Sequence, residues 1–152
     1  MAVRVQREDF DIGAELDALT RDRHDIGAVT SFVGLVRDIA GDAKIGAMTL
    51  EHYPGMTEKE LARVEAEANA RWKLSATLIV HRYGRLEPGD RIVLCAAASP
   101  HREQAFEACH FLIDWLKTSA PFWKLEDTDK GPQWVDAKTT DDAAAARWNK
   151  SQ

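Results

Sequence analysis

The sequence predicts an α+β domain with much antiparallel pairing, on three observations. Helix-like and strand-like segments do not alternate one for one, as they do in a doubly wound parallel sheet. Short turns separate neighbouring strand-like segments, and they suit antiparallel pairs because a parallel pair needs a long crossover. The sequence contains neither G-x-G-x-x-G nor a P-loop, the usual nucleotide fingerprints. Its 152 residues are the length of one domain, so residues 1–152 are taken as a single unit.

The first third of the chain predicts three strands and a short helix. Residues 3–6 alternate apolar and polar side chains, which is typical of a strand. Residues 11–19 carry acids early and predict a short helix. Residues 27–38 are rich in β-branched and aromatic side chains, which favours a strand, and residues 43–53 form the next one. Gly34 predicts a bulge or a close approach within residues 27–38.

The clearest helical pattern covers residues 54–74. Thr57 is expected to cap its N-terminus, and Glu60, three residues later, is expected to complete a capping box. One face of this helix is apolar at spacings of three and four residues, and it is formed by Leu61, Val64, Ala68 and Trp72.

The second half of the chain predicts one more long helix and four more strands. The helix covers residues 101–119, with Ser99 as its cap and Pro100 in its first turn, and it ends before Pro121. Residues 141–150 are weakly helical. The strands are residues 75–84 and 91–99, joined by the Pro-Gly turn at 86–90, and residues 122–127 and 133–137, which flank a hairpin-like turn.

Composition restricts the cellular compartment and the possible partners of the protein. A hydrophobic content of 45% with 30% charged residues indicates a soluble globular chain. No run of about 18 apolar residues is present, so no membrane span is predicted. The first ten residues lack a signal-peptide pattern, which favours the cytoplasm. The net charge of −5 argues against nucleic acid as a partner and favours a small anion or an acidic peptide tail at a local positive site.

Metal and thiol chemistry find little support in the sequence. Four scattered histidines lack zinc-type spacing, namely His52, His81, His101 and His110. We therefore expect neither a metal nor another cofactor. Cys95 and Cys109 lie in apolar stretches without a C-x-x-C motif, and we interpret them as small buried side chains.

Several basic residues have two interpretations each. His101 and Arg102 begin a predicted helix, where cations oppose the helix dipole. They are either solvated surface charge or an anion site that includes the free N–H groups of the first turn. Arg37 ends a glycine-loosened strand and is either solvated or in contact with a ligand phosphate.

Lys117 and Lys124 lie on either side of an aromatic pair, Phe122 and Trp123. Lys117 suits the C-terminal end of a helix, where a cation is favourable. Lys124 falls among apolar neighbours. Its ammonium either reaches water at a strand edge, or it is held against apolar surface, which makes an amine a better base or nucleophile. Spacing alone does not decide between these two interpretations.

Five ordered motifs resemble one protein family. They are FVGLVRD, LEHYPGMTEKEL, HRYGRLEPGD, SPHREQAFEA and LKTSAPFWKLE. From about Gly27 to Trp148 they resemble the large, catalytic subunit of molybdopterin synthase, the MoaE family. The most specific feature is LEHYPGM combined with K-x-x-x-P-F-W-K.

The resemblance implies an α/β hammerhead fold with an additional antiparallel subdomain, and an enzyme of molybdenum cofactor biosynthesis. This sulfurtransferase converts cyclic pyranopterin monophosphate, or precursor Z, to molybdopterin by forming a dithiolene. Two sulfurs come from the C-terminal thiocarboxylate on the Gly-Gly tail of a small ubiquitin-like sulfur-carrier subunit. The implied assembly is a homodimer of large subunits with one small subunit at each end, which makes a heterotetramer.

The same motifs imply the site residues. Lys117 and Lys124 match the two essential catalytic lysines of the family. The implied substrate contacts are Leu35, Val36, Arg37, His101, Arg102, Lys117, Lys124, Leu125 and Glu126. Family members often carry a basic residue at the positions of Leu35 and Leu125, so here those two contribute only backbone or packing contacts. Lys138 is a further basic candidate.

The aromatic pair then has an expected role. Two anions must meet at the site, so fixed cations are needed, and Phe122 and Trp123 are expected to form the water-excluding wall and the channel for the tail. His101 and Lys117 are 16 residues apart on one predicted helix, or about 24 Å. A two-fold dimer is therefore expected to complete each pocket with His101 and Arg102 of the other subunit, unless the helix breaks.

Two other classes of function fit part of this pattern. A non-catalytic pterin- or phosphate-binding module needs the anion site but not both lysines. A scaffold for a ubiquitin-like tail needs an apolar groove but neither Arg37 nor Arg102. Because Arg37, Arg102, Lys117 and Lys124 are all present, the pattern favours the enzyme.

Overall fold

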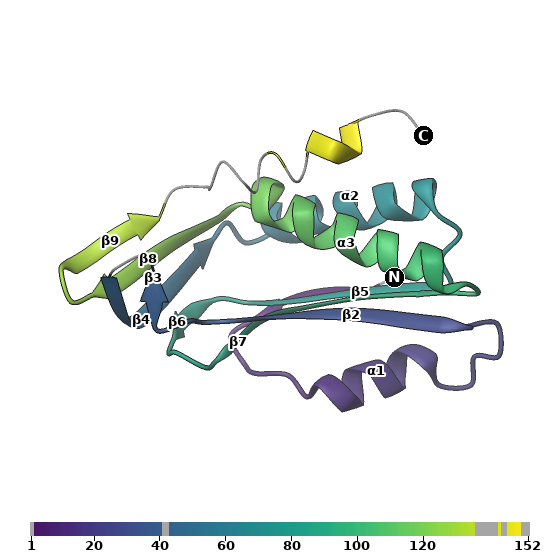
Figure 1. Ribbon diagram of the computed structural model, residues 1–152, viewed down its shortest axis with the longest axis horizontal. Coiled ribbons are helices and arrows are strands. Elements are labelled where there is room, and N and C mark those ends of the chain that lie inside the picture. The colour runs from purple at the N-terminus through teal and green to yellow at the C-terminus, as the bar shows by residue number, and fades with distance from the viewer. Residues whose placement is uncertain (1, 41–42, 136–142, 144–145, 150–152) are drawn as a thin grey trace.

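Two β-sheets organise the chain, which the computed structural model describes over residues 2–40, 43–135, 143 and 146–149. Figure 1 shows the first sheet packed between helices and the second sheet, with β4, β8 and β9, at one end of the molecule. The elements are β1 (Ala2–Gln6), α1 (Ile12–Thr20), β2 (Ala28–Leu35), β3 (Ile39–Ala40), β4 (Ala43–His52), α2 (Met56–Arg71), β5 (Ala76–Arg82), β6 (Gly84–Leu86), β7 (Arg91–Ser99), α3 (Arg102–Ser119), β8 (Phe122–Thr128), β9 (Gly131–Val135) and the 3₁₀ helix η1 (Arg147–Asn149).

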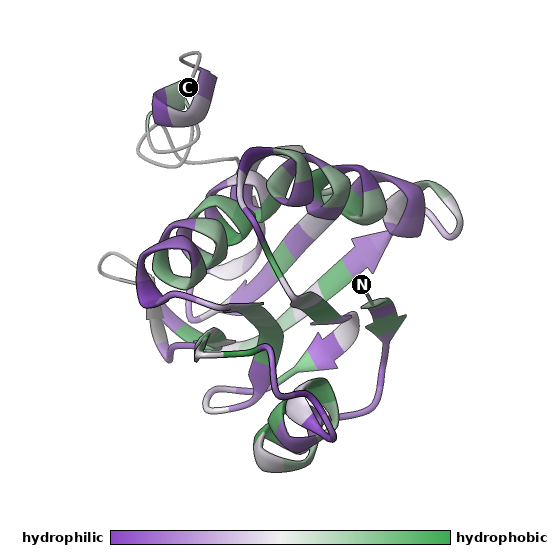
Figure 2. Cartoon of the chain, turned by 90° about the vertical axis from the view of Figure 1, so that its right-hand side faces the viewer, coloured by the Kyte–Doolittle hydropathy of each residue, from purple (hydrophilic) through white to green (hydrophobic). Residues whose placement is uncertain are grey.

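The first sheet has the strand order β1-β5-β7-β2. β1 pairs parallel to β5, and the other neighbours pair antiparallel. Helices α2 and α3 cover one face and α1 covers the other (Figures 1 and 2). Both faces of β5 are therefore buried, which explains why its sequence is an almost unbroken apolar run instead of an alternating one.

Alternation along these strands divides the core into two halves. Leu78 and Val80 pack with Phe10 on the side of α1. Ile79 and Cys95 lie in the larger cluster beneath α2 and α3. The apolar face predicted for the first long helix is confirmed, since that same cluster contains or contacts Leu61, Val64, Ala68 and Trp72.

The two cysteines are buried as predicted. Cys95 is 0% exposed and Cys109 is 3% exposed, and both are free thiols. Burial raises the pKa of Cys109 to about 11. Because the thiolate is the reactive form, this thiol is unreactive at neutral pH.

The second sheet is antiparallel throughout. Its strand order is β3-β4-β8-β9, and β6 also pairs with β4. A small core of its own includes Val36, Met48, Leu50 and Leu86. The α+β class is confirmed, together with the additional antiparallel unit. The hairpin predicted around residues 128–132 is also confirmed, as β8 and β9, although residues 136 and 137 lie outside the described residues.

Two predicted strands were too long. Residues 27–38 end their pairing in the first sheet at Leu35, after a register shift next to Gly34. Gly34 also approaches closely, since a Cβ atom there would lie 2.9 Å from Cγ1 of Val93. Residues 75–84 likewise divide at Gly84, whose φ of +93° lets the chain turn out of β5 into β6.

The predicted caps of both long helices were wrong. Helix α2 is capped at Gly55, whose N–H donates to the carboxylate of Glu58 at 2.9 Å. Thr57 lies inside the first turn, fully buried, and its hydroxyl donates to the carbonyl of Tyr53. Gly55 has a φ of +86°, a conformation that glycine adopts without steric cost and threonine does not.

The cap of helix α3 lies two residues later than predicted. The capping position is His101, so Pro100 lies outside the helix. Ser99 ends β7, where its hydroxyl donates to the carbonyl of Lys73 and accepts from the backbone N–H of His101. The hydroxyl of Ser99 thus links β7, the α2–β5 loop and the start of α3.

The weak helical pattern predicted for residues 141–150 lies mostly outside the described residues. Within them, η1 (yellow in Figure 1) lies on the outer side of α2 and α3 and contains Trp148. Trp148 is 9% exposed and packs edge-on against Trp72 and Phe111, with its indole N–H donating to Asp114 at 2.8 Å.

Candidate active site

Lys117 and Lys124 meet at a cavity between the end of α3 and the start of β8, which we name the lysine cavity. Its volume is about 90 Å³. Apart from the two lysines, its lining is mainly apolar and comes from both sheets and α3: Gly34, Leu35, Leu50, His81, Ile92, Val93, Ile113, Leu116, Ala120 and Phe122. The structure therefore brings together the two lysines that the sequence predicted.

The chain brings these lysines together by a sharp change of direction. Lys117 lies in the last turn of α3, where a cation is favoured by the helix dipole. Ala120 then has extended backbone, and β8 begins at Phe122. In β8, Lys124 lies opposite Leu50 of β4 and opposite Val135 of β9, so its position is fixed from both sides.

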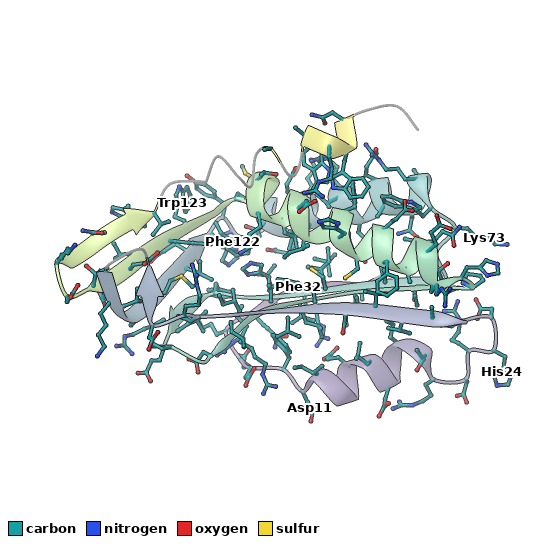
Figure 3. All side chains as sticks on the ribbon, viewed as in Figure 1. Asp11, His24, Phe32, Lys73, Phe122 and Trp123 are labelled. Atoms are coloured by element: carbon teal, nitrogen blue, oxygen red, sulfur yellow. The ribbon has the colours of Figure 1, made fainter. Side chains whose placement is uncertain are left out.

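Alternation along β8 separates the aromatic pair. Phe122, Lys124 and Glu126 share one face of the strand, and Trp123 and Leu125 share the other. Phe122 lines the lysine cavity, whereas Trp123 is 41% exposed and packs edge-on against Tyr53, with ring centroids 4.2 Å apart (Figure 3). The expectation that both rings form the wall of the pocket was therefore wrong for Trp123. A strand cannot direct two consecutive side chains to the same face.

A second cavity of about 130 Å³ adjoins the first and is named here the Arg37 cavity. Arg37, Val36 and Glu126 line it, and Leu35, Ile92 and both lysines line both cavities. Glu126 is 8% exposed, so a buried carboxyl group faces the same space as the cations. The predicted segment 35–37 thus lies at the site.

Backbone hydrogen bonds hold this segment in place. The N–H of Val36 donates to the carbonyl of Asp90 at 3.0 Å, and its carbonyl accepts from the N–H of Gly89 at 2.8 Å. The turn between β6 and β7 therefore positions Arg37. Leu35 is 54% exposed at the cavity mouth, where its side chain can only pack. Leu125 faces away from both cavities, so only its backbone is near the site.

His101 and Arg102 are not brought to this site. They lie at the start of α3 and are exposed, whereas Lys117 lies near its end. Helix α3 runs unbroken from Arg102 to Ser119, so Arg102 and Lys117 are about 22 Å apart along its axis. The alternative of a break in the helix is therefore wrong. Lys138 lies outside the described residues.

Sequence reasoning missed His81, which it had considered only as a metal ligand. His81 is the second-last residue of β5 and lines the lysine cavity, and its ring stacks on Phe122 with centroids 3.9 Å apart. Burial lowers the pKa of its imidazole to about 4, and the nearby charges of Lys124 and Lys117 act in the same direction. The signal in the sequence was a polar ring at the end of an otherwise apolar strand.

Over the part of the chain that the structure describes, no three histidine, cysteine, aspartate or glutamate side chains lie close enough to hold a metal ion. None of the described helices combines the length and apolar character needed to cross a membrane.

Comparison with known proteins gives a consistent result. The sequence profile of the family described as "MoaE protein" matches residues 5–119. The chain belongs to the MoaE family. The molybdopterin synthase catalytic subunit of Pseudomonas aeruginosa is 55% identical to it over 150 residues, which cover 99% of this chain and all of that relative.

Solved structures agree with this membership of the MoaE family. The molybdopterin biosynthesis MoaE protein of Burkholderia ambifaria is 53% identical, covers 99% of this chain and 100% of its own, and superimposes with a TM-score of 0.85. The molybdopterin synthase structure from Staphylococcus aureus is 33% identical, with a TM-score of 0.81 over 88% of this chain and 96% of its own. The family profile ends before β8, so the similarity at Lys124 rests on these full-length relatives.

Proposed function

We propose that this chain is the catalytic subunit of a molybdopterin synthase. It converts cyclic pyranopterin monophosphate to molybdopterin by transferring two sulfurs from a thiocarboxylated carrier protein, and so acts in molybdenum cofactor biosynthesis. The observation that carries the proposal is the convergence of Lys117, Lys124 and Arg37 on two adjoining cavities with largely apolar walls. The close relatives named as molybdopterin synthase catalytic subunits support it.

The electrostatics of the site suit this reaction. The substrate carries a cyclic phosphate and the carrier presents a thiocarboxylate, so two anions must approach each other. Arg37 offers a guanidinium fork that suits a phosphate, and the ammonium groups of Lys117 and Lys124 stabilise negative charge that develops during sulfur transfer. The apolar lining keeps water scarce, which strengthens these charges and protects acyl-sulfur intermediates from hydrolysis.

The partner is a small ubiquitin-like sulfur carrier with a C-terminal Gly-Gly tail. A tail without side chains is slender enough to enter a narrow opening, and the lysine cavity of about 90 Å³ is narrow. Each sulfur delivered leaves the carrier with a carboxylate in place of its thiocarboxylate. The working assembly is a heterotetramer built on a homodimer of this chain, in the cytoplasm.

Mass spectrometry of the product tests the proposal. Purified protein is incubated with cyclic pyranopterin monophosphate and a thiocarboxylated carrier, and the expected result is a product that has gained two sulfurs. Carrier with an ordinary C-terminal carboxylate is the matched control and should give no product. Binding of the pterin without conversion would indicate a binding module instead, and binding of the carrier alone would indicate a scaffold.

A further inference from the structure

The hydrogen bonding of His81 fixes which of its ring nitrogens carries the proton. Nδ1 lies 2.8 Å from the backbone carbonyl of Arg82, and because a carbonyl can only accept, Nδ1 must carry the proton. The ring is 8% exposed and stacks on Phe122 at an interplanar angle of 16°. In the described part of the chain Nε2 has no hydrogen-bond partner, and the residue lines the cavity.

This ring is neutral under the conditions in which the protein works. Burial holds the pKa of His81 at about 4. The charged or titratable groups around it are Lys124 from β8, Lys117 from α3 and His52 from β4, and all three disfavour a further positive charge. Nε2 is therefore an unprotonated acceptor that borders a cavity rich in cations.

The geometry of β8 makes Lys124 the candidate donor to Nε2 of His81. Phe122 and Lys124 share one face of β8 and are separated by two residues, which is roughly 7 Å. His81 stacks flat on Phe122, and all three residues line the same cavity. Lys117 lines the same cavity from the last turn of α3, outside this strand.

We propose that His81 is a positioning residue for Lys124: a rotation of the lysine side chain within the cavity that both residues line brings its ammonium to Nε2, which accepts a hydrogen bond from it and holds it at the site of sulfur transfer. This inference rests on the proposed function and adds a residue to it. A neutral acceptor suits the site better than a carboxylate would. Glu126 already brings one carboxyl group to the adjoining cavity, and a second would reduce the positive charge further and repel both anionic reactants, whereas imidazole orients the ammonium without removing its charge.

Two isosteric substitutions separate this role from a structural one. In His81→Gln the side-chain carbonyl can replace Nε2 as an acceptor, but the donor to Arg82 is lost. In His81→Asn the amide can replace Nδ1–H as the donor, but the acceptor in the cavity is lost. Both variants lose the stacking on Phe122, so each is a control for the other.

The proposal predicts opposite effects of the two substitutions on turnover. His81→Asn should lower kcat by about 10- to 100-fold, the cost of a misplaced catalytic group, with KM little changed. His81→Gln should keep kcat within about threefold of the unmodified protein. If His81 only anchors the chain through Nδ1, the order reverses and His81→Asn is the more active variant, which overturns the proposal.

A second measurement does not depend on activity. In protein labelled with ¹⁵N-histidine, NMR should show Nδ1 of His81 protonated and Nε2 unprotonated at pH 7. Lys124→Met should shift the Nε2 resonance more than Lys117→Met does. A protonated Nε2, or no response to Lys124→Met, contradicts the proposal. If the NMR result holds but the unmodified protein forms no dithiolene, the proposed function fails while the contact between His81 and Lys124 stands.

Discussion

Two chains, each inactive alone, should regain activity as a mixed dimer if the active site is shared between subunits. The structure places Arg102 and Lys117 at opposite ends of the unbroken helix α3, about 22 Å apart. A pterin-sized ligand cannot contact both. If both contact the substrate, as the family resemblance implies, each pocket must take Arg102 from one subunit and Lys117 from the other.

The two cavities of a single chain are smaller than an ordinary small-molecule site, which supports a site completed by a second subunit. The lysine cavity and the Arg37 cavity have volumes of about 90 and 130 Å³, whereas small-molecule sites are usually roughly 300–1,000 Å³. An open groove of about 590 Å³ continues from Lys117 along α3 and the edge strand β2, with the exposed rings of Phe32 and Phe106 in its lining. A second subunit packed along this groove would enclose the substrate space that one chain leaves open.

The assay uses Arg102→Ala and Lys117→Ala chains with different affinity tags, co-expressed and purified in tandem so that only mixed dimers remain. In a shared arrangement, one of the two sites in such a dimer takes both intact residues, so about half of the unmodified activity should return. Unselected random mixtures contain mixed dimers as about half of the population, so roughly a quarter should return.

The matched control pairs an unmodified chain with a chain carrying both substitutions. In a shared arrangement each of its sites lacks one residue, so this dimer should be inactive. If each chain builds its own site, the control dimer keeps about half of the activity and the first dimer has none. That reversed pattern would refute the shared site.

The remaining predictions concern single residues. Lys117→Ala should abolish dithiolene formation but lower the free energy of unfolding by only roughly 0.3–1 kcal/mol, since its structural role is confined to the helix dipole; near-normal turnover would remove Lys117 from the catalytic pair. Lys124→Arg should also impair turnover, because a guanidinium keeps the charge but neither deprotonates nor fits a compact ammonium position; normal turnover would leave Lys124 an electrostatic contact only. Phe122→Ala should slow sulfur transfer more than Trp123→Ala, since only Phe122 lines the lysine cavity, and equal rates in transfer assays would show that the carrier tail does not pass this ring. Acid should destabilise the fold below pH 6.5, because unfolded His81 gains a proton that the buried ring, with a pKa of about 4, does not accept. The free energy of unfolding should fall by about 2 kcal/mol at pH 5. Urea unfolding at pH 7 and pH 5 measures this loss, which should be missing in His81→Gln. The same pH dependence in His81→Gln as in the unmodified protein would contradict the burial of a neutral His81.

Much of the fold followed from local patterns in the sequence. The α2 face was predictable because it repeats at helical spacing, and the hairpin of β8 and β9 because a turn sequence separates two strand-like segments. The division of residues 75–84 between two sheets was not predictable. It depends on Gly84, whose positive φ turns the chain, and on β4, a partner distant in sequence. The cap at Gly55 was missed because a backbone conformation, not a side chain, makes it suitable.

At the site, residues near each other in sequence were predicted better than residues that meet only in space. Lys117, in the last turn of α3, and Lys124, in β8, are close in sequence, so their spacing already indicated a shared location. His81 reaches the same cavity only through the pairing of β5 with β7 and the packing of β8 beyond them. Its role depends on which nitrogen bonds Arg82, and no sequence pattern encodes that choice.

The register of β8 decides which side chains take part in the chemistry. Successive residues of a strand face opposite sides, so a shift of one residue would replace Phe122 and Lys124 in the cavities by Trp123 and Leu125. The chain prevents this shift by pairing β8 on both sides, where Leu50 and Val135 lie opposite Lys124. A strand at the edge of the sheet would be held from one side only. The antiparallel sheet therefore contributes more than a surface for the site, because its pairing selects the lysine, and not its apolar neighbours, to face the two cavities.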